Sequence, residues 1–260
     1  MECSQITAKL EELSPCFYAE NWDNVGMLLG DKKRKISKIY VAVDATDKVV
    51  DEAILLGADM IITHHPLIFS PMKKITTEDF IGRRVLKMLE NKICYYAMHT
   101  NFDVTHMAEL AADKIGLTTR SVLEVTYEGE TFKAGIGKVG LLPEEITLSK
   151  CAEQVKEKFD VEQVKIFGEP LHKVQTVAIC PGSGKSVIDC AVKAGAQVLI
   201  TGDIDHHEGI DAVAKGLTVI DAGHYGLEHI FVLYIVKYLE EECSGVEVIW
   251  EVKKNPFWYM

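Results

Sequence analysis

Short β-type runs alternate with helical segments along most of this 260-residue chain, and this alternation most limits its possible folds. In the first half, Thr46 can cap a helix that ends near Gly57. The other elements expected there are strands at 39–43, 59–63 and 93–98 and helices at 79–90 and about 105–116. Such alternation predicts βαβ units with parallel strands, and therefore an α/β fold.

A similar pattern returns later in the chain, with strands at 177–179 and 197–201 around a helix between Gly184 and Gly195. The segment 195–201 matches 57–63 at four of seven positions, and 41–43 aligns with 177–179. Two ordinary βαβ units of similar composition would also give this match. We favour an internal duplication, which predicts an α/β fold of two similar lobes with a cleft between them, at the carboxyl ends of strands.

The stretch from about 121 to 172 is less regular and begins the expected second lobe. It contains expected strands at 122–127 and 132–139 and an amphipathic helix at 147–159. A long helix at about 225–240 and a strand at 246–250 follow, and the tail 253–260 is expected to pack on the surface or on a neighbouring subunit. We therefore expect one lobe from 1–120 plus 222–260, and a second from 121–221.

Composition limits the classes of function. The net charge of −11 argues against broad nucleic-acid binding, which needs a basic surface. Seven cysteines form no C-x-x-C pair, and no targeting segment or membrane-length apolar run is present, so we expect a cytoplasmic protein with reduced thiols.

The segment 181–186 resembles the end of a P-loop, but Ile179 stands where the first glycine is needed. Its glycines can form a strand-to-helix turn, which can still hold an anion.

Two histidines, His64 and His65, directly follow the apolar run 60–63 and precede Pro66. A strand that stops at such a pair places it at a carboxyl end, where open α/β sheets bind ligands. Pro66 bends the backbone just beyond them, so both imidazoles can face one cleft. Two imidazoles in one cleft suit a borderline metal ion.

Three further polar clusters follow expected strands, at 99–103, 203–208 and 224–229. Asp103 can reach the metal, or it can cap the helix after it. His224 and Glu228 are four residues apart and share a helix face. Alternatively, His224 is a water-exposed residue at the start of the helix, and Glu228 only interacts with the positive end of the helix dipole. His229 is expected to be structural, and His206 and His207 are expected in an exposed turn.

Counting donors gives three imidazoles and two carboxylates, from His64, His65, Asp103, His224 and Glu228. Five ligands with two carboxylates able to bridge suit two divalent ions. Mixed nitrogen and oxygen donors suit zinc, iron, manganese, cobalt or nickel, among which the sequence does not choose.

Several short motifs appear in order along the chain: Trp22-Asp23-Asn24-Val25-Gly26, Ile62-Thr63-His64-His65-Pro66-Leu67, His99-Thr100-Asn101-Phe102-Asp103, Gly182-Ser183-Gly184, Thr201-Gly202-Asp203, and Asp221-Ala222-Gly223-His224-Tyr225 with Glu228. Together they resemble the Nif-three-like family, whose members bear the name GTP cyclohydrolase I type 2 homologue. The resemblance covers nearly the whole chain. It implies two interlinked α/β lobes, a ring-shaped homohexamer and a dinuclear metal centre, with the same five ligands by matching position.

Three functions follow as hypotheses. The first is a metal-dependent hydrolase of a nucleotide-like substrate, GTP cyclohydrolase-like by resemblance alone, with His99 or His207 as general acid or base. In it, Lys73 and Lys74 can hold phosphate, although a solvated loop explains both lysines better. The second is a non-catalytic metal carrier or chaperone, which the ligand set fits equally well. The third is a regulatory scaffold that acts through an oligomeric surface.

Overall fold

The computed structural model describes residues 1–258 and 260 and divides into two compact units. Unit 1 comprises 1–102 and 231–254, and unit 2 comprises 103–230 and 255–260. The expected boundaries at 120 and 222 differ from these. Helix α5 (Ala108–Lys114) buries Ala111 and Ala112 in the core of unit 2, so the first boundary falls before this helix.

Unit 1 is built on a five-stranded sheet in the order β1-β4-β3-β2-β11. Its strands are β1 (Gly26–Leu29), β2 (Lys38–Ala42), β3 (Met60–Thr63), β4 (Cys94–Ala97) and β11 (Glu247–Trp250). The pairs among β4, β3, β2 and β11 are parallel, and β1 is antiparallel to β4. The parallel βαβ arrangement expected from the sequence is therefore present in this unit.

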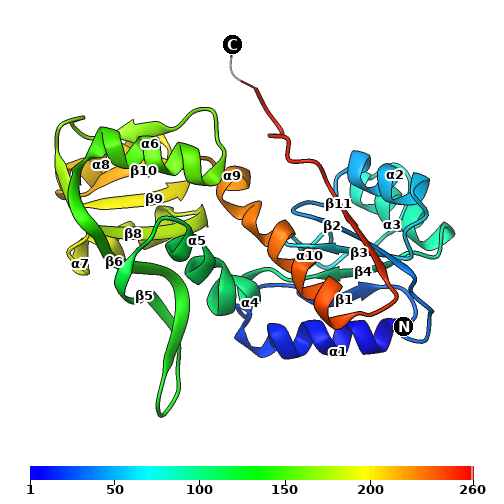
Figure 1. Cartoon of the computed structure of the whole chain (residues 1–260). Coiled ribbons are helices and arrows are strands. Elements are labelled where there is room, and N and C mark those ends of the chain that lie inside the picture. The colour runs from blue at the N-terminus through cyan, green and yellow to red at the C-terminus, as the bar shows by residue number, and fades with distance from the viewer. Residues whose placement is uncertain (259) are drawn as a thin grey trace. The chain divides into compact units, whose positions relative to one another are not determined.

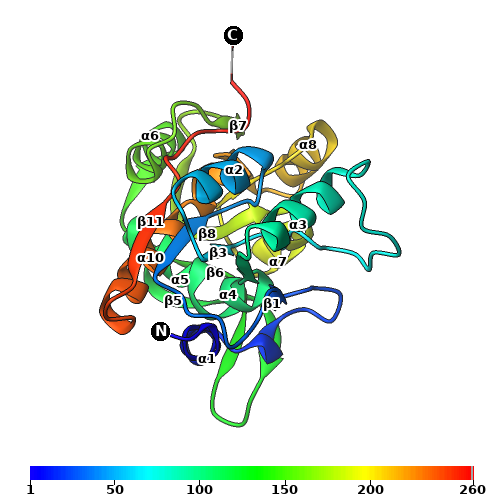
Figure 2. The same ribbon diagram turned by 90° about the vertical axis from the view of Figure 1, so that its right-hand side faces the viewer.

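Helices cover the sheet of unit 1 (Figures 1 and 2). They are α1 (Cys3–Leu13), η1 (Cys16–Tyr18), α2 (Asp47–Leu55), α3 (Phe80–Glu90), α4 (Thr100–Phe102) and α10 (Ile230–Glu242). Helices α2 and α3 pack on the sheet face that presents Tyr40, Ile61 and Tyr95. The Thr46 cap is confirmed, since its side chain accepts from Val49 N–H.

Unit 2 contains a six-stranded sheet in the order β5-β6-β8-β9-β10-β7. Its strands are β5 (Thr118–Glu128), β6 (Lys133–Thr147), β7 (Lys165–Phe167), β8 (Lys173–Ser183), β9 (Val198–Gly202) and β10 (Thr218–Asp221). Strands β8, β9 and β10 are parallel, whereas β5, β6 and β7 pair in antiparallel fashion. The long β5–β6 hairpin in Figure 1 extends well beyond the strands expected at 122–127 and 132–139.

Helices cover both faces of the second sheet and enclose two apolar cores. One core contains α5 and α6 (Leu148–Phe159); the other contains α7 (Ile188–Lys193) and α8 (His206–Ala214). Three short helical segments complete the unit: η2 (Asp103–Met107), η3 (Lys185–Val187) and α9 (His224–Glu228). The expected helix at 147–159 is confirmed as α6, capped by Thr147.

Both units contain a parallel strand–helix–strand unit, β2-α2-β3 and β8-α7-β9. The register differs from the simple sequence alignment. Val41 pairs with Ile62, whereas Ile179, not Val177, pairs with the corresponding Ile200. The first strands therefore correspond with an offset of two residues, which keeps the same side chains on the same face because the side-chain period of a strand is two.

Two expected helix boundaries are wrong. The helix expected from about Thr105 begins at Thr100, because the Asp23 carboxylate accepts the Thr100 backbone N–H and hydroxyl. The helix expected at 225–240 is two helices, α9 and α10, that meet at His229.

In the C-terminal tail, which we expected to pack on the surface or on a neighbouring subunit, Phe257 and Trp258 are exposed. Tyr259 belongs to the same tail but lies outside the described residues. No helix of the described residues has the length and apolar character needed to cross a membrane.

Candidate metal centre

Three histidines of unit 1 form a cluster at the carboxyl ends of β3 and β4. The rings of His64 and His65 lie 4.9 Å apart between centroids, and the ring of His99 lies 5.3 and 5.5 Å from them. One ring nitrogen from each histidine lies within 4.8 Å of the others, close enough to hold a metal ion. The sequence correctly placed His64 and His65 together, and the structure adds His99 to their group.

Each of these rings is held through its Nδ1 atom. His64 Nδ1 lies 2.7 Å from the Met98 carbonyl oxygen, His65 Nδ1 lies 2.8 Å from Asp44 Oδ1, and His99 Nδ1 lies 2.9 Å from Asp23 Oδ1. A carbonyl or ionised carboxylate only accepts, so each Nδ1 donates its hydrogen. Nε2 is then the ring atom of each histidine that can bind a metal, which is the arrangement of carboxylate–histidine–metal sites.

Asp23 is the most firmly held of the supporting carboxylates. Its side chain is fully buried, which by itself raises the pKa. The hydrogen bonds from His99 and Thr100 outweigh burial and lower the pKa of Asp23 to about 2. An ionised Asp23 therefore fixes the orientation and tautomer of His99 and also begins helix α4.

Unit 2 gathers a second group of donors. His224 and Glu228 lie one turn apart on α9, with His224 Nε2 3.0 Å from Glu228 Oε2. An Asp103 oxygen and a Glu228 oxygen lie within 4.8 Å of each other. Asp103 begins the π-helical turn η2, a local distortion that is frequent at functional sites. The shared helix face expected for His224 and Glu228 is therefore confirmed.

The unit 2 histidine is held in the same way as those of unit 1. His224 Nδ1 lies 2.7 Å from Asp203 Oδ2, in the loop that follows β9. Asp203 has a φ of 57°, in the left-handed region that residues other than glycine rarely adopt. Backbone strain of this kind concentrates at functional sites, and here it presents the carboxylate to His224.

The glycines of unit 2 make room for these donors. A Cβ at Gly182 would lie 2.6 Å from Glu228 Oε1, and a Cβ at Gly202 would lie 2.5 Å from the His224 backbone nitrogen. The turn at 182–184, which the sequence analysis treated as a possible anion site, therefore faces a carboxylate. That negative charge disfavours phosphate at this position.

The pKa of the buried Cys180 thiol is affected by the same carboxylates. Burial raises the pKa of Cys180, and the charges of Asp103, Glu124 and Glu228 raise it further. A cation bound to Asp103 and Glu228 would offset this charge. Unit 2 therefore offers two close pairs of donors, His224 with Glu228 and Asp103 with Glu228, and imidazole and carboxylate donors suit a divalent ion such as zinc, iron or manganese.

The remaining candidates lie apart from these groups. His206 and His207 are exposed, as expected, but they begin helix α8 and do not lie in a separate turn. Among the described residues neither belongs to a cluster of potential metal ligands. His229 is buried at the junction of α9 and α10 and packs against Tyr225. Lys73 and Lys74 are exposed in the 70–78 loop.

Sequence reasoning missed the roles of Asp23, Asp44 and Asp203. Asp23 and Asp203 fall within motifs that carry the family resemblance, so their positions were marked without their role. Asp44 had no such signal. All three lie 21 or more residues from the histidine that each one holds, which places the pairing beyond any local sequence pattern.

Comparison with known proteins places this geometry in a family. The family model for Duf34/NIF3 (NGG1p interacting factor 3) matches residues 1–256. A "GTP cyclohydrolase 1 type 2 homolog" of Clostridium acetobutylicum is 34% identical over 233 residues, covering 89% of this chain and 87% of the relative. The relative of the same name in Clostridium perfringens is 31% identical over 261 residues, covering 99% of both chains.

A solved structure supports the same assignment. The Bacillus cereus protein related to NIF3 superposes with a TM-score of 0.92 at 26% identity, covering 100% of this chain and 99% of that one. The family model and both named relatives span most of the chain, including the segments that contain both groups of donors. The chain therefore belongs to the DUF34/NIF3 family.

Proposed function

We propose that this protein is a metal-dependent hydrolase with a dinuclear centre, and that His64, His65, Asp103, His224 and Glu228 hold its two divalent ions. The observation that supports it most is the shared arrangement of the histidines. His64, His65 and His224 each donate Nδ1–H to a carbonyl or carboxylate, which makes Nε2 the ring atom that would bind a metal.

Chain connectivity supports a single centre made from both groups of donors. The chain leaves unit 1 after Phe102 and returns at Phe231. Within unit 1, the His64 ring lies 6.4 Å from the Phe102 ring and 5.2 Å from the Phe231 ring. Asp103 directly follows Phe102, and Glu228 precedes Phe231 by three residues, so both carboxylates are close along the chain to residues that pack against the His64 ring.

Two bound divalent ions would supply Lewis acidity and activate water for attack. The chain itself supplies the proton carrier, which we assign to His99. Asp23 accepts His99 Nδ1–H and fixes the orientation of the ring, so Nε2 is the atom that would take up or release a proton. The relatives' name, GTP cyclohydrolase 1 type 2 homolog, suggests a nucleotide-like substrate.

Metal analysis and turnover together test this function. Wild-type protein reconstituted with zinc, iron or manganese would be assayed for bound metal and for hydrolysis of a nucleotide panel that includes GTP. We expect turnover that depends on metal, and a loss of about a hundredfold or more in Glu228→Gln with the fold retained. Stoichiometric metal uptake without turnover of any nucleotide would contradict the hydrolase.

A metal carrier is the second candidate, and one observation favours it. The side chains of His65 and His224 are 23% and 30% exposed, so another molecule can approach part of the donor set. Rapid transfer of metal to a competing chelator, measured by stopped-flow absorbance in the absence of turnover, would support the carrier. Slow transfer combined with turnover would support the hydrolase.

We further propose a homohexamer, as the family resemblance implies. Phe257 and Trp258 are 50% and 78% exposed and offer apolar surface to another copy. Light scattering after size-exclusion chromatography gives the mass directly. A monomer at micromolar concentration would exclude the hexamer.

A further inference from the structure

A basic run in unit 1 stands out in this acidic chain. Residues 32–35 read Lys-Lys-Arg-Lys, although the whole chain has a net charge of −11. Beside this run is an open cavity of about 600 Å³. It is lined by Gly30, Asp31, Arg34, Lys35, Leu89, Lys92 and Ile93. Of these described residues three are cationic and one is acidic, so the cavity has a positive charge.

The cavity lies at the opposite end of the parallel strands from the histidines. Arg34 and Lys35 precede β2, and Lys92 and Ile93 precede β4, whereas His64 and His65 follow β3. The amino and carboxyl ends of parallel strands lie at opposite edges of the sheet. This cavity is therefore separate from the candidate metal centre and belongs to unit 1 alone.

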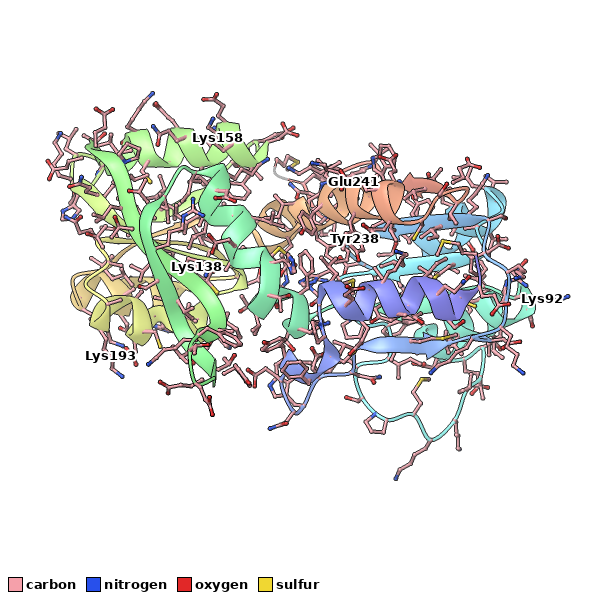
Figure 3. The ribbon with its side chains drawn as sticks, turned by 60° about the horizontal axis from the view of Figure 1, so that its bottom comes forward. Lys92, Lys138, Lys158, Lys193, Tyr238 and Glu241 are labelled. Carbon is pink, nitrogen blue, oxygen red and sulfur yellow. The ribbon has the colours of Figure 1, made fainter. Side chains whose placement is uncertain are left out.

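Lys92 occupies a backbone conformation that usually belongs to glycine. Its φ is 57°, just after α3 ends. Four other described helices have glycine at the corresponding position: Gly57, Gly116, Gly195 and Gly216. A residue other than glycine at this position lowers the stability of the folded chain by roughly 1 kcal/mol. Figure 3 shows Lys92 at the margin of unit 1 with its side chain directed outward.

The cations of the cavity retain capacity for an anion. Lys92 forms no ion pair with any residue in the described part of the chain. Arg34 Nη2 lies 2.9 Å from Asp59 Oδ1, but Asp59 also accepts from Ser37 and Lys38, and the buried Arg34 Nε has no acceptor among the described residues.

The carboxylates of Glu2 and Asp31 compete only weakly with that anion for these cations. Lys35 pairs with Glu2 at 3.1 Å on the exposed surface, where an ion pair adds little stability. The carboxylate of Asp31 already accepts the Lys33 N–H at 2.9 Å.

We propose that this cavity binds a small phosphate ester, whose phosphate pairs with Arg34, Lys35 and Lys92 and whose carbon body contacts Leu89. Guanidinium and ammonium groups together are the usual protein partners of phosphate. Leu89 is 45% exposed at the wall and offers apolar area to an organic group. The concave shape and the acidic remainder of the surface favour a small ligand over a nucleic acid.

The test is calorimetric titration of the full-length protein with phenyl phosphate and, separately, with inorganic phosphate. We expect saturable binding, tighter for phenyl phosphate, and an affinity about tenfold lower in Lys92→Gly. Because glycine suits φ 57°, Lys92→Gly is also expected to raise the melting temperature by roughly 1–3 °C, so weak binding cannot be attributed to unfolding.

Three variants serve as controls. Asp160→Gly also replaces a left-handed residue at a helix end, with φ 50°, but lies in unit 2. Lys158→Gln removes one exposed cation from the same unit. His65→Ala removes a proposed metal ligand. All three are expected to bind phenyl phosphate as the wild type does.

Four results would overturn the proposal: no saturable binding, equal affinity for inorganic phosphate, unchanged binding in Lys92→Gly, or displacement of phenyl phosphate by a random duplex oligonucleotide. Loss of binding in His65→Ala alone would assign the anion to the metal centre. Because metal content and nucleotide turnover are measured separately, failure here leaves the proposed hydrolase untouched.

Discussion

The corresponding strand ends of the two units perform different tasks. After β3, Thr63 is followed by His64 and His65, two potential ligands. At the corresponding place after Thr201 in unit 2 come Gly202 and Asp203, neither of which belongs to the groups of potential ligands among the described residues. Gly202 admits the backbone of His224, and Asp203 holds its Nδ1 atom. One strand end provides donors, and its counterpart positions a donor from the next loop.

The largest effect is expected for Gly202→Ala. A Cβ there would lie 2.5 Å from the backbone nitrogen and 2.7 Å from the Cα of His224, and backbone atoms cannot move aside cheaply. We expect the free energy of unfolding to fall by about 3 kcal/mol, measured by urea denaturation of metal-free protein. A loss below about 1 kcal/mol would show that the loop before α9 adapts, and the contrast between the strand ends would weaken.

Removing the orienting carboxylates tests whether both units support their histidines alike. Asp44→Asn and Asp203→Asn each keep the size of the side chain. They remove the negative charge of the carboxylate that accepts Nδ1–H of His65 and of His224, respectively. Metal affinity is expected to fall by about tenfold to a hundredfold in each, as is typical of such supporting residues. Competition with a fluorescent chelator measures this fall. Unchanged affinity in Asp203→Asn alone would restrict the metal centre to unit 1.

Acid stability separates the buried carboxylate Asp23 from the exposed Asp203. The pKa of Asp23 is lowered from 3.8 to about 2, so the folded state binds its proton more weakly than the unfolded chain does. Asp23 therefore contributes about 2 kcal/mol above pH 4, and this contribution disappears as the pH falls from about 4 to 2.

Asp23→Asn tests this contribution in metal-free protein, by urea unfolding at several pH values. The variant should be less stable at neutral pH, and its stability should change less between pH 4 and pH 2. The side chain of Asp203 is 55% exposed, so Asp203→Asn serves as the matched variant at an exposed carboxylate that also holds a histidine. A parallel pH profile for Asp23→Asn and wild type would contradict the assignment.

The smallest effects are expected at the matched helix ends. Gly57 and Gly195 have φ of 70° and 71°, and a Cβ at either would meet no atom within 4 Å. Gly57→Ala and Gly195→Ala should therefore each lower the unfolding free energy by about 1 kcal/mol, by backbone strain alone. A difference above about 1 kcal/mol between them would show that the two units are less alike than their helices suggest.

Local patterns in the sequence determined the secondary structure well. Thr46 caps the helix that its position predicts, the amphipathic helix expected at 147–159 is present, and His64 and His65 directly follow a buried strand. These features depend on residues within about four positions of one another, where capping and side-chain periodicity act. The family motifs, spread over most of the chain, also indicated the DUF34/NIF3 membership that comparison confirms.

Tertiary structure alone decided how the histidines are held and where the helices around them begin. Asp23 reaches His99 and Thr100 across more than 70 residues, and by doing so moves the helix start from about Thr105 to Thr100. Likewise, α5 joins unit 2 because its alanines pack on that sheet. Such pairings depend on which surfaces meet when the chain packs, and no short-range rule encodes that choice.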